Sequence, residues 1–218
     1  MVHAQLENLY RQMEGLVSLY STLGVQFPLP PMRHWAASPD FASLLIRLVF
    51  QHRPRLVLEA GSGVSTVLLG YALRRLGAGR VISLEHSQAF MSLTEELIDL
   101  HQLGDVAEVR HAPLETVALS GGSWLWYSVR EIDDIDEIDM VVVDGPPGDT
   151  QPLARYPALP ILQSRLSNRA LVVLDDMVRS DEQEIVKRWE SEFDGYARED
   201  YQTEKGATVL EFRAEQSV

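Results

Sequence analysis

Cysteine is absent from this chain of 218 residues. A disulfide framework and a metal site built from thiolates are therefore both excluded. Basic residues are scarce as well, because 19 lysines and arginines stand against 32 aspartates and glutamates, for a formal net charge of −13. A surface of that sign repels phosphate, so we predict neither nucleic acid nor an anionic membrane as a partner.

Long apolar runs and several catalytic signatures are also missing. No run approaches the ~20 apolar residues of a membrane-spanning helix. The amino terminus, M-V-H-A-Q-L-E, lacks the basic and then apolar pattern of a signal peptide. Without a P-loop, an H-E-x-x-H or a G-x-S-x-G motif, NTPase and hydrolase functions have no support. A cytoplasmic enzyme of bacterial type fits this composition.

The most informative stretch of the chain runs from Arg55 to Gly70. It begins with a short apolar run, Leu56–Leu58, of the kind found in parallel strands that are buried on both faces. The run stops at Gly61-Ser62-Gly63, and apolar residues then recur at helical spacing. The order strand, glycine turn, helix directs free N–H groups of the helix start into a crevice at the carboxyl end of the sheet. Such a crevice suits a nucleotide or nucleoside.

Two details of this turn narrow the choice of ligand. The spacing is G-x-G-x-x-T, with Thr66 where a dinucleotide fingerprint has its third glycine. Glu59 stands at the strand tip, two residues before Gly61, where a carboxylate disfavours a pyrophosphate and favours a cationic or hydroxyl-bearing ligand. S-adenosylmethionine has both features, since it carries a sulfonium, an ammonium and two ribose hydroxyls.

A second acid ends the next predicted strand, which covers residues 80–85. Glu85 follows the glycine turn by about twenty residues, where nucleotide-binding α/β units place an acid against ribose hydroxyls. A carboxylate can accept both hydrogen bonds of a diol. We therefore predict that Glu85 binds a ribose. The adjacent His86 either flanks the adenine or lies in a solvated loop.

The motif L-E-A-G-S-G-V-S-T resembles the first motif of class I S-adenosylmethionine-dependent methyltransferases. Its G-S-G-x-S-T form resembles a bacterial subgroup whose second hallmark is D-G-P-P, present here at Asp144 to Pro147. The resemblance covers residues 38 to 213. It implies S-adenosylmethionine as cofactor and a small-molecule acceptor that is methylated at oxygen. The cofactor-binding residues that it implies are Glu59, Gly61, Ser62, Gly63, Ser65, Thr66, Glu85, His86, Ala112, Pro113 and Asp144.

Strands and helices alternate along most of the chain. Strands are expected over residues 56–58, 80–85, 106–111, 140–144, 170–174, 196–201 and 208–212. We predict an α/β fold: a doubly wound, mostly parallel seven-stranded sheet with helices on both faces and a C-terminal antiparallel hairpin. This is the Rossmann-like fold that the resemblance implies. Two finer expectations are a helix over residues 151–167 and a capping box of Ser180 and Gln183.

Three aromatic residues, Trp124, Trp126 and Tyr127, precede the fourth predicted strand. They stand in a hairpin or a loop, where they either cover the pocket or form a small core of their own.

Residues 1–37 are predicted to form an N-terminal helix and a proline-rich connector, ahead of a cofactor-binding domain at residues 38–218. Apolar residues fall on one face of the helix, which spans residues 3–24: Leu6, Leu9, Tyr10, Met13, Leu16, Val17 and Tyr20. We expect this face to pack on its own domain. A lid, or an arm that forms a homodimer, is the alternative. The connector either borders a substrate pocket or is a plain loop.

Acids end the fourth and fifth predicted strands, namely Asp144 and the pair Asp175-Asp176. This pattern resembles the magnesium site of metal-dependent O-methyltransferases, which have an Asp and then an Asp-Asp or Asp-Asn pair at these places. On that resemblance the three aspartates hold magnesium, and Asp144 and Asp175 act in catalysis. The lysine that catechol-type enzymes carry after the first Asp is absent from G-P-P-G. Alternatively, Asp144 touches the methionine moiety and the pair shapes a turn.

Two other functions remain open on the sequence alone. An NAD-dependent oxidoreductase would use the same fold and Glu85, although Glu59, D-G-P-P and the missing third glycine count against it. A non-catalytic nucleoside-binding module is the other alternative, because a fold does not determine a function.

Overall fold

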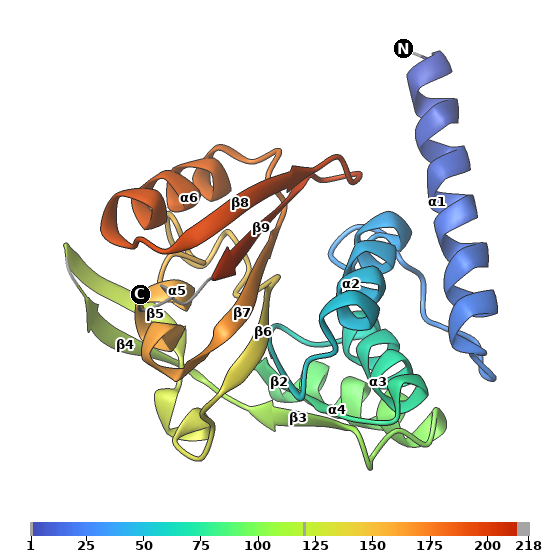
Figure 1. The fold of residues 1–218 in the computed structure, drawn as a ribbon, viewed down its shortest axis with the longest axis horizontal. Coiled ribbons are helices and arrows are strands. Elements are labelled where there is room, and N and C mark those ends of the chain that lie inside the picture. The colour runs from blue at the N-terminus through green and yellow to red at the C-terminus, as the bar shows by residue number, and fades with distance from the viewer. Residues whose placement is uncertain (1, 120, 213–218) are drawn as a thin grey trace, which may run out of the picture.

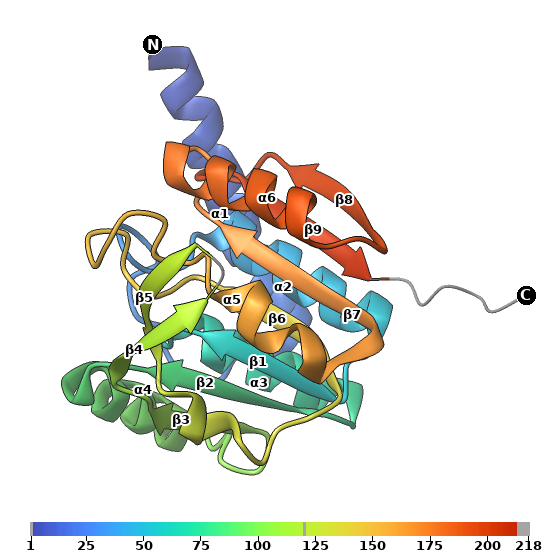
Figure 2. The same cartoon turned by 90° about the vertical axis from the view of Figure 1, so that its left-hand side faces the viewer.

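The structure of the protein, a computed structural model, describes residues 2–119 and 121–212. A seven-stranded sheet in the order β3-β2-β1-β6-β7-β9-β8 crosses the molecule (Figure 2). The strands of this sheet are β1 (Leu56–Ala60), β2 (Arg80–Glu85), β3 (Ala107–His111), β6 (Ile138–Val143), β7 (Leu166–Asp175), β8 (Tyr196–Tyr201) and β9 (Ala207–Phe212). The first five strands of this order, namely β3, β2, β1, β6 and β7, run parallel to one another. Strand β9 pairs antiparallel with both β7 and β8. The predicted sheet and its C-terminal hairpin are confirmed.

Helices cover both faces of the sheet (Figure 1). One layer holds α1 (Val2–Leu23), α2 (Pro39–His52), α3 (Val64–Leu76) and α4 (Gln88–Leu100). The other layer holds α5 (Ala158–Leu162), α6 (Ser180–Glu192) and a separate hairpin of β4 (Leu114–Leu119) and β5 (Gly122–Tyr127). Short 3-10 turns lie at Val129–Ile132 and Gln163–Arg165. In the described part of the chain, no helix is long and apolar enough to cross a membrane.

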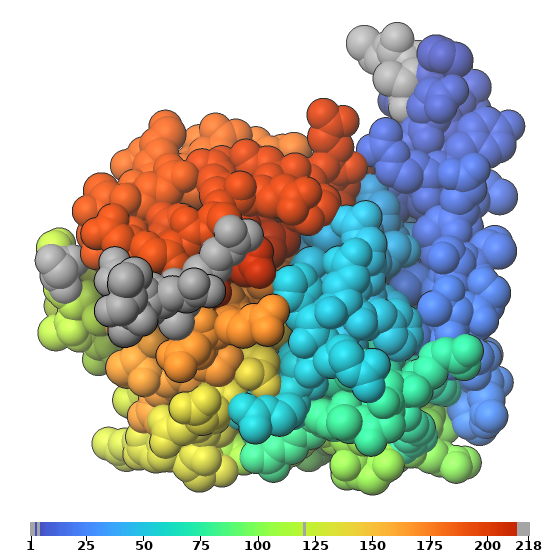
Figure 3. All heavy atoms as spheres, viewed as in Figure 1, coloured from blue at the N-terminus to red at the C-terminus, as the bar shows by residue number. Residues whose placement is uncertain are grey.

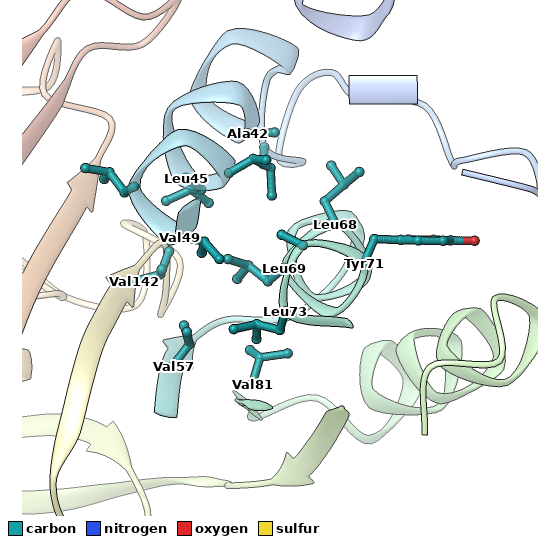
Figure 4. Packing of buried hydrophobic residues seen from close by; sticks show 14 of the residues in the cluster. Ala42, Leu45, Val49, Val57, Leu68, Leu69, Tyr71, Leu73, Val81 and Val142 are labelled. Atoms are coloured by element: carbon teal, nitrogen blue, oxygen red, sulfur yellow. The ribbon is translucent and has the colours of Figure 1, made fainter. Parts of the chain in front are cut away.

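The central strands are buried on both faces, which explains their continuous apolar sequences. Successive side chains of a strand point to opposite sides. Val57 and Val142 pack against α2 and α3 (Figure 4). Their neighbours Leu58 and Val141 pack on the other side, in the cluster that contains Trp189 of α6. A strand covered on both sides needs no polar alternation, so its apolar run is short and unbroken.

The direction in which the chain adds strands reverses between β1 and β6. From β1 the chain builds β2 and β3 on one side, and it later returns to place β6 and β7 on the other. Crevices for ligands lie at such a switch point, beyond the carboxyl ends of the strands. Here the ends of neighbouring strands stay in contact. The Asp144 N–H donates to the Ala60 carbonyl (3.0 Å), which joins the end of β6 to the end of β1. The Gly61 N–H donates to the Leu84 carbonyl (3.0 Å), which joins the end of β1 to β2.

Two local predictions are wrong. The helix expected over residues 151–167 is confined to α5, because Pro157 lacks an N–H and restricts the turn before it, so a helix can begin only there. The capping box is not formed, since Arg179 is the residue that precedes the first turn of α6. Gln183 instead donates to the Met177 carbonyl at 3.0 Å.

Helix α1 lies along one edge of the molecule, and its first turns extend past the rest of the chain (Figure 3). It packs on α2 through Gly15, Leu19 and Leu23. Of the face predicted to pack on the domain, Tyr20 is half-buried and its hydroxyl accepts from the Leu29 N–H (3.0 Å), whereas the other six residues are exposed, which corrects the prediction for them. We call this exposed face the α1 stripe, and it consists of Leu6, Leu9, Tyr10, Met13, Leu16 and Val17. The division of the chain at residues 37 and 38 stays a prediction.

The contact between β1 and β6 leads to a test of Gly145. A Cβ atom there would overlap the Tyr127 hydroxyl and lie 3.2 Å from the Ala60 carbonyl oxygen. We expect Gly145→Ala to lower the free energy of unfolding by ~1–3 kcal/mol, as overpacking does. Adding Tyr127→Phe removes the obstructing oxygen and should restore part of the loss. Urea denaturation measures both.

Gly104→Ala is the matched control, because an added Cβ there meets no atom within 4 Å. If Gly145→Ala were as stable as the unchanged protein, the close approach of the two strand ends would be wrong.

Candidate active site

Two cavities open at the carboxyl edge of the sheet. The first, which we call the glycine-turn cavity, has a volume of about 540 Å³ and lies over the turn between β1 and α3. The second, the arginine cavity, has a volume of about 490 Å³ and contains Arg155 and Arg179. Trp35, Asp144 and Pro147 border both. A ligand in one cavity can therefore approach a ligand in the other beside Asp144.

Most of the predicted cofactor residues surround the glycine-turn cavity. They come from the turn after β1, the end of β2 and the end of β6: Glu59, Gly61, Ser62, Gly63, Ser65, Glu85, His86 and Asp144. The remaining three, Thr66, Ala112 and Pro113, do not line it. Thr66 and Ala112 are fully buried, and Pro113 is exposed outside the cavity. Contacts of these three with a cofactor stay predictions.

Glu59 is a buried carboxylate held by hydroxyl groups. Its Oε2 accepts hydrogen bonds from Thr66 Oγ1 (2.6 Å) and Ser83 Oγ (2.5 Å). Thr66 Oγ1 in turn accepts from the Gly63 N–H (3.1 Å), which ties the glycine turn to the strand. The other oxygen, Oε1, has no hydrogen-bond partner within the described chain. Burial raises the pKa of Glu59 to about 7, and nearby hydroxyls, first that of Ser65, oppose this rise.

Glu85 faces the same cavity from the end of β2. Its Oε2 accepts from Ser62 Oγ (3.0 Å), and its Oε1 accepts from the Ser87 N–H (2.9 Å). His86 Nδ1 lies 3.1 Å from that same Oε1. The His86 ring also meets the edge of Tyr127, with 6.2 Å between the ring centres. Glu85 and His86 thus both line the glycine-turn cavity, and their contacts with a ribose and an adenine stay predictions.

The aromatic residues of the β4–β5 hairpin divide between two roles. Trp126 and Tyr127 are each 1% exposed and belong to the core under the hairpin. Tyr127 also lines the glycine-turn cavity. Trp124 packs on Tyr156, with 4.7 Å between ring centres. The hairpin is therefore the correct one of the two predicted arrangements, and it is mainly core.

The proline-rich connector borders the site, which was one of its two predicted roles. Pro30, Arg33 and His34 line the glycine-turn cavity. Trp35, which is 74% exposed, stands at the boundary of both cavities. Its large apolar side chain is open to a ligand in either one.

The three predicted strand-end aspartates converge. Oxygen atoms of Asp144, Asp175 and Asp176 all lie within 4.8 Å of one another. Their exposure differs, because Asp144 borders both cavities and Asp176 borders the arginine cavity, whereas Asp175 is 0% exposed and lines neither. Burial raises the pKa of Asp175 to about 8, and the neighbouring carboxylates of Asp144 and Asp176 add to this effect. Burial also raises the pKa of Asp144, against the attraction of Arg155.

Sequence reasoning missed the basic residues that accompany these acids. Arg155 Nη2 donates to Asp176 Oδ2 (2.8 Å) and Asp144 Oδ1 (3.2 Å). Arg179 Nη1 is 2.9 Å from Asp176 Oδ2. Lys205 Nζ is 3.7 Å from Asp175 Oδ2 and also 3.7 Å from Asp176 Oδ1. One signal for Arg155 was available, since it is the single charge in the apolar run L-A-R-Y-P-A-L-P-I-L.

These residues do not fit the predicted magnesium ion. Magnesium needs oxygen ligands at ~2.0–2.1 Å in octahedral geometry. Asp144 Oδ1 and Asp176 Oδ2 accept hydrogen bonds from Arg155. Both oxygens of Asp175 and Oδ1 of Asp176 accept no hydrogen bond in the described chain, but the Lys205 ammonium lies 3.7 Å from Asp175 Oδ2 and from Asp176 Oδ1. A divalent ion in this place would lie in contact with protein cations. We therefore derive no step through a metal.

Comparisons with known proteins agree with this geometry. A family described as "Methyltransferase domain" matches residues 58–177. The SAH-bound methyltransferase PaMTH1 of Podospora anserina is 15% identical with a TM-score of 0.68, and the match covers 97% of this chain and 95% of that one. An O-methyltransferase of Bacillus cereus in complex with SAH is 18% identical with a TM-score of 0.62, covering 93% and 90%.

A third similar structure is the O-methyltransferase TomG of Streptomyces achromogenes, in complex with SAM and involved in tomaymycin synthesis. It is 17% identical with a TM-score of 0.61, covering 94% of this chain and 90% of that one. No curated protein matches the sequence. At these identities the solved structures establish the fold.

The raised pKa of Glu59 predicts a pH dependence of stability. The folded protein binds this proton more tightly than the unfolded chain, whose carboxyl has the ordinary value of 4.5. The stabilisation is therefore complete below about pH 4.5 and is lost as the pH rises to about 7. At 1.36 kcal/mol per pKa unit, the loss is at most ~3 kcal/mol. Glu59→Gln cannot ionise, so its free energy of unfolding should fall less over this range.

Urea denaturation at a series of pH values measures this slope. Glu95→Gln, on an exposed position of α4, is the control and should follow the unchanged protein. A Glu59→Gln variant with the same slope as the unchanged protein would show that Glu59 titrates normally.

Proposed function

The chain belongs to the methyltransferase-domain family, and on that premise we propose that it transfers a methyl group from S-adenosylmethionine to an oxygen of a small molecule. One observation carries the proposal. Residues from the ends of β1, β2 and β6 line a single cavity at the switch point of the sheet, and this cavity meets a second, polar one at Asp144. The O-methyltransferases of similar fold in complex with SAH and with SAM support the same conclusion.

In this proposal the methyl donor occupies the glycine-turn cavity. Glu59 offers its unpartnered Oε1 to the cationic methionine part, since a carboxylate of raised pKa gains most from a positive ligand. Glu85 accepts hydrogen bonds from the ribose hydroxyls, and His86 with Tyr127 borders the adenine. The backbone at Gly61 and Gly63 allows the ligand to approach closely, because neither residue carries a Cβ.

The acceptor is proposed to occupy the arginine cavity. Its hydroxyl oxygen attacks the methyl carbon in line with the carbon–sulfur bond. A carbon–oxygen bond forms, and the electron pair of the broken bond stays on sulfur as S-adenosylhomocysteine is released. The hydroxyl proton passes to Asp144, whose raised pKa makes it a better base and which borders both cavities. Holding both reactants in this alignment is the main contribution of the protein.

A direct catalytic role for Asp175 remains a prediction, because its buried carboxylate borders neither cavity. Location in the cytoplasm, a bacterial origin and the lack of nucleic-acid or membrane partners also remain predictions. They rest on composition, chiefly the net charge of −13.

Ligand binding separates this function from the alternatives. We expect S-adenosylmethionine and S-adenosylhomocysteine to raise the melting temperature and NAD to leave it unchanged, because a ligand that binds only the folded state stabilises it. Transfer of a labelled methyl group to a hydroxylated acceptor then distinguishes an enzyme from a non-catalytic nucleoside-binding module. Stabilisation by NAD alone would favour the oxidoreductase.

Removal of the Glu85 carboxylate should weaken donor binding. The loss of its hydrogen bonds to a ribose diol should cost ~1.5–3 kcal/mol, or roughly 10- to 150-fold in Kd. Calorimetry on Glu85→Ala measures it. Glu96→Ala, at an exposed position of α4, is the control. Equal affinity of Glu85→Ala and the unchanged protein would place the ribose elsewhere.

We also propose that the α1 stripe pairs with a second copy of this chain. Leu6, Tyr10, Met13 and Val17 recur at alternating spacings of four and three, the pattern of a helix that packs on another helix. Val17 is 68% exposed and Tyr10 61%. Contiguous apolar surface of this kind marks an interface. In an antiparallel pair centred on Met13, Arg11 would approach Glu14 of the second copy, so the same patch serves both chains.

The proposed dimer can be tested by its mass in solution. Light scattering after size exclusion should give a particle mass of about twice the chain mass of 24.5 kDa. The charge introduced by Val17→Glu should shift the mass toward the monomer. Leu100→Glu, which changes a leucine that is 47% exposed on α4, should not. A monomeric mass for the unchanged protein at tens of micromolar would contradict the proposal.

A further inference from the structure

We propose that Arg155 is a built-in cation of the transfer site and stands in place of a divalent metal ion. The inference rests on the proposed methyl transfer for its consequence in catalysis. The arrangement of charges on which it depends does not need that function. Arg155 acts as a positioning residue, since it touches Asp144 and does not touch the donor cavity.

The contacts of Arg155 join two strand ends. Its Nη2 donates to both the carbonyl oxygen (2.8 Å) and the Oδ1 (3.2 Å) of Asp144, which follows β6. The same nitrogen donates to Oδ2 of Asp176 (2.8 Å), and Nη1 donates to the carbonyl of Asp175 (3.2 Å), at the end of β7. A shared magnesium ion would bridge these two strand ends in the same way, through their carboxylates.

The side chain of Arg155 is only 3% exposed. A buried guanidinium is tolerated only when charges and hydrogen bonds compensate it. The planar fork of arginine presents several donors at fixed angles, so one side chain can serve two carboxylates and two carbonyls. Its position is therefore determined by the strand ends, and in turn it orients the carboxylate of Asp144 between the two cavities.

Protein cations stand beside every carboxylate of the cluster. Arg155, Arg179 and Lys205 lie 2.8 to 3.8 Å from oxygens of Asp144, Asp175, Asp176 and Glu182. A divalent ion among the same oxygens would be repelled by all three basic groups. It would have to displace Arg155 from Asp144 Oδ1 and Asp176 Oδ2, or lie beside the Lys205 ammonium at the oxygens of Asp175 and Asp176 that accept no hydrogen bond.

Measurements on the unchanged protein test the proposal directly. Titration with Mn²⁺, followed by electron paramagnetic resonance, should show no saturable site at millimolar metal. Mg²⁺ should not raise the melting temperature, and EDTA should leave methyl transfer intact. Saturable binding of one Mn²⁺ per chain that Asp144→Asn abolishes would overturn the proposal. Loss of turnover in EDTA that Mg²⁺ restores would overturn it as well.

Replacement of Arg155 should create the metal site that it now occupies. Arg155→Met keeps the length of the side chain and removes its charge, so the carboxylates of Asp144 and Asp176 lose their shared cation. We expect Arg155→Met to bind Mn²⁺ roughly tenfold or more tightly than the unchanged protein does, because a buried carboxylate that has lost its partner is stabilised by a bound cation. Affinity for S-adenosylmethionine should change little, and turnover should fall. Failure of a folded Arg155→Met to gain Mn²⁺ binding would overturn the proposal.

Arg165→Met is the matched control. The Arg165 side chain is 24% exposed, donates to the carbonyls of Ile132 (3.0 Å) and Ile135 (2.8 Å), and lines neither cavity. It should gain no metal site. If Arg155→Met does not fold, Arg155→Lys keeps the charge and should still bind no Mn²⁺, whereas metal binding by Arg155→Lys would count against the proposal. The metal titrations probe the aspartate cluster in the absence of the methyl donor. A wrong methyltransferase assignment would be detected by a different measurement, because S-adenosylmethionine would then not raise the melting temperature.

Discussion

Carboxylates held almost out of water at one edge of the sheet determine how the rest of the site is built. Glu59, Asp175 and Asp176 are each at most 2% exposed. Ionised groups in such positions are costly unless they receive hydrogen bonds or lie beside a cation. The acids stand at the carboxyl ends of parallel strands, beside the point where the order in which the chain adds strands reverses. The surrounding polar residues therefore serve first to make this burial possible.

The protein compensates the two groups of acids in different ways. Hydroxyl groups of Thr66 and Ser83 hold Glu59 and add no charge, so its negative charge is available to a cationic ligand. Arginine and lysine side chains stand beside the aspartate cluster, where a metal ion would otherwise lie. This difference gives the two cavities different chemistry. Under the proposed function, the first would hold the sulfonium donor and the second a polar acceptor beside Asp144.

The sequence predicted what depends on neighbours along the chain. The strand, glycine turn and helix around Gly61 follow from local spacing, and so do the acids that end the strands. Arg155 was not predicted because its partners Asp144 and Asp176 are brought together by the parallel pairing of β6 and β7. The exposed stripe of α1 was also mispredicted. Helical spacing identifies an apolar face but does not say what the face contacts. In the structure α1 packs on α2 through Gly15 and Leu19, so the apolar stripe points away from the domain.

The N-terminal connector and the turn between β8 and β9 meet at the same site, so residues outside the matched family region contribute to it. Lys205 stands in the turn between β8 and β9, and its Nζ donates to the Ala36 carbonyl (3.2 Å), next to Trp35. The same turn is bound by the early helices, since Asn8 donates to Glu204 Oε1 (3.2 Å) and the Glu204 N–H donates to Asp40 Oδ2 (2.8 Å). The position of the Lys205 ammonium beside Asp175 thus depends on the packing of the N-terminal segment. A change in that segment reaches the aspartate cluster through a single turn.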